Sequence, residues 1–137
     1  QQRVATGRSL RTMSELTTRA ARELSTPLLT VIAGGAYCEV THGTCVTDGV
    51  GNHANNERCT VRANQQLYAT ATYFQTETYF DRITIGGTQY SGSTIIPTNV
   101  AMAAGDTFSW YADYSVVRGG FIICATDALV PSWFVML

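Results

Sequence analysis

The pattern that most constrains this chain is a series of short alternating segments that begins at Leu28 and is broken repeatedly by Gly, Asn and Asp. The clearest segment, residues 67–74, assigns alternate residues to two faces, Tyr68, Thr70, Thr72 and Phe74 on one and Leu67, Ala69, Ala71 and Tyr73 on the other. A period of two residues is typical of β-strands, because successive side chains point to opposite faces. The pattern predicts an all-β domain of many short strands.

Further segments support this fold class. Residues 81–85 and 88–91 flank Gly86-Gly87, which is a two-residue hairpin signal. Residues 106–112 and 120–124 supply two more strands, and residues 48–56 lack an apolar period, which predicts a loop. We therefore expect a two-sheet antiparallel β-sandwich of jelly-roll type over residues 34–126, preceded by one helix.

The first 33 residues are expected to form an arm outside the sandwich. Apolar residues recur there at three- and four-residue spacing, predicting an amphipathic helix over residues 9–25, at Leu10, Met13, Leu16, Ala20 and Leu24. Such a helix packs against the domain edge or inserts into a partner's groove. Five arginines and two glutamates give residues 1–25 a charge of +3. We take Arg11, Arg19 and Arg22 as candidate partner contacts.

Residues 127–137 form an apolar tail, in which Trp133 and Phe134 are further candidate partner contacts. A free apolar end would be a liability, so we expect it to pack under the domain or within a partner. No segment of the sequence is long and apolar enough to span a bilayer.

The charge balance argues against nucleic acid as a partner. The 137 residues carry a net charge of −1, which suits a single domain without the basic face that phosphate contacts require. Outside the arm, four arginines stand against eight acids. The chain therefore combines a basic arm with an acidic domain.

The four cysteines, Cys38, Cys45, Cys59 and Cys124, predict two disulfides and an oxidising extracytoplasmic compartment, either secreted, at the cell surface or in an organelle lumen. Sequence alone leaves all three pairings open. Zinc is the alternative, because His42 and His53 lie among the first three cysteines. The spacing fits no standard zinc finger and leaves Cys124 unpaired, so we expect disulfides beside two surface histidines.

Three acids, Glu77, Asp81 and Asp113, lie in segments that are otherwise β-patterned and aromatic. A carboxylate at the end of an apolar strand is costly unless it is paired or binds a cation. Three converging oxygen donors describe a site for a hard cation, and Ca²⁺ is the cation we expect. The alternative is three solvated loop acids.

Catalysis is not expected. Neither His42 nor His53 lies in the sequence context of a nucleophile, and nothing indicates a deep cleft that would make Glu77 and Asp81 a glycosidase acid pair. A group of aromatic residues would suit a carbohydrate- or protein-binding surface: Trp110, Tyr111, Tyr114, Trp133 and Phe134. Trp110 alternates with Phe108, however, which favours the core for both.

The motifs between residues 38 and 125 also follow a specific order. A strand opened by Cys59 precedes a Phe-x-x-Glu strand end at Phe74–Glu77 and a Phe-Asp pair at Phe80-Asp81. A Gly-Gly hairpin, a Ser-Trp-x-x-Asp-x-Ser segment at 109–115 and Gly-Phe-Ile-Ile-Cys at 120–124 follow. This ordered set resembles CUB domains, particularly the CUB-like modules common in protist proteins.

The resemblance implies a non-catalytic extracellular binding module of jelly-roll type. It also implies Ca²⁺ at one end of the sandwich, bound by Glu77, Asp81 and Asp113 with Ser115 and the Tyr114 carbonyl in support. Its disulfides would be Cys38–Cys59 and Cys45–Cys124, with Cys45–Cys59 and Cys38–Cys124 as the second choice. The loop between Glu77 and Asp81 departs from typical CUB domains, because it is shorter and lacks their cysteine.

We therefore expect a protein-binding module whose loops are ordered by calcium, with Tyr79 and Tyr114 at the partner surface. The alternative is a structural subunit of a larger, lumenal and membrane-associated assembly. In that case the basic arm and the apolar tail would make the contacts, and the sandwich would be their scaffold.

Overall fold

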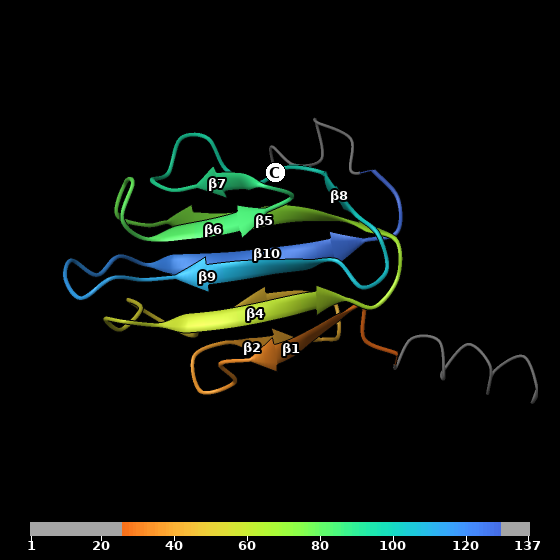
Figure 1. Cartoon of the computed structure of the whole chain (residues 1–137), viewed down its shortest axis with the longest axis horizontal. Helices are drawn as coiled ribbons and strands as arrows, with labels where there is room; N and C mark the ends of the chain where they lie inside the picture. The colour runs from red at the N-terminus through yellow and green to blue at the C-terminus, as the bar shows by residue number, and fades with distance from the viewer. Residues whose placement is uncertain (1–25, 130–137) are drawn as a thin grey trace, which may run out of the picture.

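A computed structural model describes residues 26–129, which form ten β-strands in two five-stranded antiparallel sheets. The sheets lie one behind the other in Figure 1. The predicted helix at 9–25, the arginines of the arm, Trp133 and Phe134 lie outside the described residues. Within the described part of the chain, no helix has the length and apolar character needed to cross a membrane.

The first sheet has the order β1-β4-β9-β6-β7. Its strands are β1 (Leu29–Ala33), β4 (Arg58–Ala63), β9 (Thr107–Tyr111), β6 (Arg82–Ile85) and β7 (Thr88–Tyr90). The second sheet has the order β2-β3-β10-β5-β8. Its strands are β2 (Glu39–Thr41), β3 (Cys45–Thr47), β10 (Gly120–Thr126), β5 (Leu67–Gln75) and β8 (Val100–Met102).

The core lies between the two sheets, because each strand buries alternate residues. Its largest fully buried apolar side chains include Leu67, Ile83, Phe108, Trp110 and Phe121. The predicted hairpin is confirmed, since Ile85 and Thr88 are directly paired across Gly86 and Gly87. The two-sheet antiparallel sandwich is therefore confirmed.

The boundary of the sandwich at residue 34 was wrong. Residues 29–33, which we assigned to the arm, form β1 and pair with β4, and Leu29 is 1% exposed. The alternating pattern that begins at Leu28 already covered this strand, and the boundary was placed too late because only Leu29 in it is fully buried while Val31 is partly buried.

The predicted faces of β5 were also wrong beyond Ala71. Ile123 pairs with Ala71 and Ile122 with Tyr73, so that Thr72 has no partner and forms a β-bulge. The extra residue reverses the alternation, and consequently Phe74 is buried on the same side as Leu67 and Ala69 while Tyr73 is exposed. A bulge depends on the partner strand and is not visible in one strand's own pattern.

The structure contains two disulfides, Cys38–Cys59 and Cys45–Cys124, which is the pairing that the resemblance to CUB domains implies. The first joins β4 to the segment before β2, and the second joins β3 to β10. No described cysteine is free, so none offers the thiolate that the zinc alternative required. The disulfides are compatible with an oxidising compartment.

Three loops meet at one end of the sandwich. The β5–β6 loop and the β9–β10 loop lie together at the left of Figure 1, opposite the end at which the described chain begins. The β3–β4 loop reaches the same end, because His53 donates its backbone N–H to the Arg118 carbonyl at 2.9 Å and Asn56 donates to the Asp113 carbonyl at 2.7 Å. The β5–β6 and β9–β10 loops carry the predicted acids.

Candidate functional site

The structure brings the three predicted acids together. Glu77 follows β5, Asp81 directly precedes β6, and Asp113 lies two residues beyond β9. One carboxylate oxygen of each lies within 4.8 Å of one oxygen of both others. Antiparallel strands carry these residues to the same edge of the molecule although Asp113 is 32 residues from Asp81.

Asp81 is the centre of this cluster and is 0% exposed. Its Oδ1 accepts the Asp113 backbone N–H at 2.8 Å, which ties the β9–β10 loop to the start of β6. Its Oδ2 has no hydrogen-bond donor, and the same holds for the buried Oε1 of Glu77. A buried carboxylate oxygen without a donor loses its hydration without compensation.

The loop between Glu77 and Asp81 is a tight turn. The backbone N–H groups of Phe80 and Asp81 both donate to the Glu77 carbonyl, at 3.2 and 3.0 Å. Tyr79 has a φ of 73°, a region that disfavours residues with a side chain, and its backbone N–H donates to the Ser91 hydroxyl at 2.9 Å. The turn thus aims Glu77 toward Asp81 and leaves Tyr79 on the surface.

The electrostatics of the cluster oppose three negative charges. Burial is the main cause that raises the pKa of Glu77 and of Asp81, and the neighbouring carboxylates raise the pKa of both further. A cation bound between the carboxylates would favour the charged forms and offset this repulsion.

The sequence analysis missed two buried polar residues beside the cluster, His53 and Glu57. We expected His53 on the surface, but it is 3% exposed, and Glu57 is 4% exposed. Glu57 accepts the Trp110 indole N–H at 2.9 Å through Oε1 and the Ala54 N–H at 2.8 Å through Oε2. The His53 ring packs edge-on against Trp110, with centroids 5.2 Å apart.

His53 also contacts the acid cluster. Its Nδ1 donates to the Ala54 carbonyl at 2.8 Å, and its Nε2 accepts the Arg118 backbone N–H at 3.2 Å, which together define the neutral ring. Asp81 Oδ2 lies 3.2 Å from that same Nε2. Two acceptors therefore face each other, and this contact would be an ion pair only with a protonated ring. A cation on Asp81 Oδ2 would remove the conflict.

The remaining predicted residues differ in their placement. The backbone N–H of Ser115 donates to Asp113 Oδ1 at 3.1 Å, which fixes that carboxylate in the loop. Tyr79 and Tyr114 are exposed beside the cluster, at 81% and 78%. Trp110 is 1% exposed and is excluded from any binding surface, as its alternation with Phe108 indicated.

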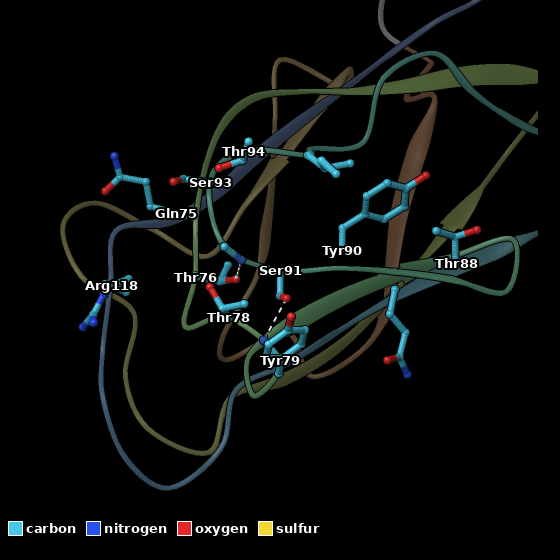
Figure 2. Close-up of a pocket in the computed structure, with 13 residues that line it drawn as sticks. Gln75, Thr76, Thr78, Tyr79, Thr88, Tyr90, Ser91, Ser93, Thr94 and Arg118 are labelled. Carbon is cyan, nitrogen blue, oxygen red and sulfur yellow. Dashed lines mark hydrogen bonds between the residues drawn. The ribbon is translucent and has the colours of Figure 1, made fainter.

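A hollow of about 660 Å³ lies beside the acid cluster. Figure 2 shows the hydroxyl-bearing side chains around it, with Tyr79 at one side and Tyr90 and Thr88 along β7. The Gly92 backbone N–H donates to the Thr76 hydroxyl at 2.9 Å, and the Thr76 backbone N–H donates to the Gly92 carbonyl at 3.0 Å. This pair joins the end of β5 to the segment after β7 and supports the turn at Tyr79.

Comparison with known proteins adds no relative to this description. No protein-family model matches the chain, and a search of the curated proteins finds no match. The resemblance to CUB domains accordingly remains a hypothesis that rests on the order of motifs.

Proposed function

We propose that this chain is a non-catalytic, CUB-like protein-binding module in which Ca²⁺ orders the loops at one end. The ligands are carboxylate oxygens of Glu77, Asp81 and Asp113, with Ser115 and the Tyr114 carbonyl in support. Calcium takes six to eight oxygen ligands, so water would complete the shell.

The observation that carries the proposal is the pair of buried carboxylate oxygens without donors, Asp81 Oδ2 and Glu77 Oε1, in a group of three acids. Asp81 is held in place by Asp113 and cannot turn toward solvent without losing that hydrogen bond. The three proposed ligands are all hard carboxylate oxygens, which favour calcium over transition metals, and the neighbouring His53 Nε2 already accepts the Arg118 backbone N–H.

The surface around the site suits a partner protein. Tyr79, Phe80 and Tyr114 are exposed at 81%, 54% and 78%, and all belong to the two loops that carry the acids. Aromatic residues beside a charged centre are typical anchors of protein interfaces. In CUB domains the cation orders loops that contact a basic side chain of the partner, and we propose the same arrangement here.

The test is calcium titration by calorimetry on the oxidised full chain. We expect saturable binding with a Kd on the order of 10⁻⁴ M, as in extracellular calcium modules. The double variant Asp81→Asn, Asp113→Asn keeps the size and the acceptor oxygen of both side chains, and we expect it to weaken binding at least ~10-fold, about 1.4 kcal/mol.

A second double variant, Glu39→Gln with Asp127→Asn, is the matched control. It also removes two negative charges, but at exposed positions outside the cluster, and it should bind calcium as the wild type does. Absence of binding at millimolar calcium, or equal loss in both double variants, would contradict the proposal.

The alternative, a structural subunit that docks through Arg11, Arg19, Arg22, Trp133 and Phe134, concerns residues outside the described part of the chain. It stays a prediction. Loss of assembly with retained calcium binding after deletion of residues 1–27 or 130–137 would favour it.

A further inference from the structure

The outer face of the first sheet, the nearer sheet in Figure 1, carries an unusual row of side chains. Arg58 on β4 and Arg82 on β6 are both paired with Tyr111 on β9, which lies between them. The two guanidinium carbons lie 3.7 and 4.6 Å from the centroid of the Tyr111 ring. One ring thus holds two cations in place by cation–π contact.

A third arginine lies on the same face. Arg62 is on β4 four residues beyond Arg58, and its neighbours across the strands are Thr30 and Thr107. The positions next to these arginines along the strands carry hydroxyl side chains. Thr60 on β4 and Thr84 on β6 both pair with Ser109 on β9. We call Arg58, Arg62, Arg82, Tyr111 and this hydroxyl row the arginine face.

The positive charge of the arginine face is not neutralised. Arg58 donates to the Glu57 and Ala112 carbonyls, Arg82 to the Tyr79 and Phe80 carbonyls, and Arg62 to the Asn64 side-chain oxygen. Within residues 26–129 no salt bridge involves these three arginines, and the close contact between His53 and Asp81 lies outside the arginine face. In that part of the chain four arginines stand against eight acids, and three of the four arginines lie here.

We propose that the arginine face binds an extended sulfated polysaccharide. Strand geometry separates Arg58 and Arg62 by about 14 Å along β4. The guanidinium groups of Arg58 and Arg82 lie closer together, because both stack on Tyr111. One small anion cannot contact both this pair and Arg62, whereas a chain with repeated sulfate groups can. Guanidinium groups suit such oxyanions, because their planar N–H donors match two oxygens at once.

The composition of the face favours a polysaccharide over other polyanions. Protein interfaces depend on buried apolar anchors, and the only large ring here, Tyr111, already stacks with two guanidinium groups. The same stacking leaves no aromatic surface for the bases of a single-stranded nucleic acid. Short hydroxyl side chains instead provide donors and acceptors for sugar hydroxyls.

The experiment measures binding of a heparin fragment to the oxidised full chain by calorimetry, at several salt concentrations and with EDTA present. EDTA makes the result independent of the calcium proposal. We expect binding that weakens with salt, and a neutral dextran of similar length should not bind. Arg62→Gln should weaken heparin binding about fivefold at 0.1 M salt and reduce the salt slope by about one.

The matched control is Arg118→Gln, which removes the same charge from an exposed arginine in another loop and should change heparin binding less than twofold. The double variant Arg62→Gln, Arg82→Gln should be weaker again than Arg62→Gln alone. If the double variant still binds heparin as the wild type does, other basic groups bind the heparin, and the proposal is overturned. Equal or tighter binding of a single-stranded DNA oligonucleotide, or of a poly-glutamate peptide, would overturn the choice of a sulfated polysaccharide.

Discussion

At the scale of single residues, Asp48 shows how a half-buried acid affects the stability of this fold. It follows β3, and its Oδ1 accepts the Phe121 backbone N–H at 2.9 Å, while its Oδ2 is buried without a donor. Burial is the main cause that raises its pKa from 3.8 to about 6. The charge therefore opposes folding at neutral pH, although the hydrogen bond to β10 supports it.

The pH dependence of stability follows from this shift. Between the unfolded pKa of 3.8 and the folded pKa of about 6, the folded chain binds more protons than the unfolded chain at Asp48. The free energy of unfolding contributed by this group therefore falls as pH rises through that window, and the stabilisation is complete only below it. We expect Tm of the calcium-free protein to fall between pH 4 and pH 6.

Asp48→Asn isolates this contribution, because the amide keeps the acceptor for Phe121 and cannot ionise. The variant should lose part of the Tm decrease between pH 4 and pH 6, and the remainder should come from Glu77 and Asp81, whose pKa values are also raised. Differential scanning calorimetry of both proteins in EDTA measures the difference. Parallel Tm curves for wild type and variant would contradict the assignment.

The sequence indicated part of the candidate site and not the rest. Glu77, Asp81 and Asp113 were visible because a carboxylate stands out in an apolar, aromatic segment. His53 and Glu57 lie in or beside a polar loop, where a buried side chain looks the same as a solvated one. The requirement of a buried Trp110 for a hydrogen-bond acceptor was a usable signal, although it does not identify Glu57 as that acceptor.

At the scale of strands, the start of β10 depends on a glycine. Gly120 has a φ of 91°, and a Cβ placed on it would lie 2.1 Å from Asp48 Oδ2. Gly120→Ala should therefore strain the backbone and displace the carboxylate that binds the Phe121 N–H. We expect a loss of about 2 kcal/mol or more in the free energy of unfolding, measured by urea denaturation.

Gly35→Ala is the control for that variant. Gly35 is exposed, and a Cβ there meets nothing within 4 Å. Its effect should stay within about 0.5 kcal/mol. A similar small effect of Gly120→Ala would show that β10 can shift away from Asp48 without cost.

Strands were predictable where their own residues determine them. The hairpin between β6 and β7 follows from Gly86 and Gly87, whose φ values of 59° and 82° are those that a tight turn needs. The faces of β5 were not predictable past Thr72, because the bulge there results from pairing with β10. Pairing between distant segments decides register, and a single strand does not contain that information.

At the scale of the whole molecule, the two disulfides constrain the unfolded chain to different degrees. Cys45–Cys124 spans 79 residues and joins β3 to β10, whereas Cys38–Cys59 spans 21 residues. Loop-closure entropy predicts a stabilisation of about 4.5 kcal/mol for the longer loop and about 3.3 kcal/mol for the shorter one. These two stabilisation energies differ little. Cys38 and Cys59 are more deeply buried, so replacing them also costs packing in the folded state, and this offsets the advantage of the longer loop.

The dependence of stability on denaturant separates the two effects. Replacing Cys45 and Cys124 by Ala lets the unfolded chain expand over most of the described sequence, so the urea m-value should rise more than it does when Cys38 and Cys59 are replaced. Burial of the cysteines in the folded state has no comparable effect on the m-value, because it does not change how far the unfolded chain expands. Equal m-values in the two double variants would mean that the unfolded chain stays compact without the longer link, and that Cys45–Cys124 acts mainly on the folded state.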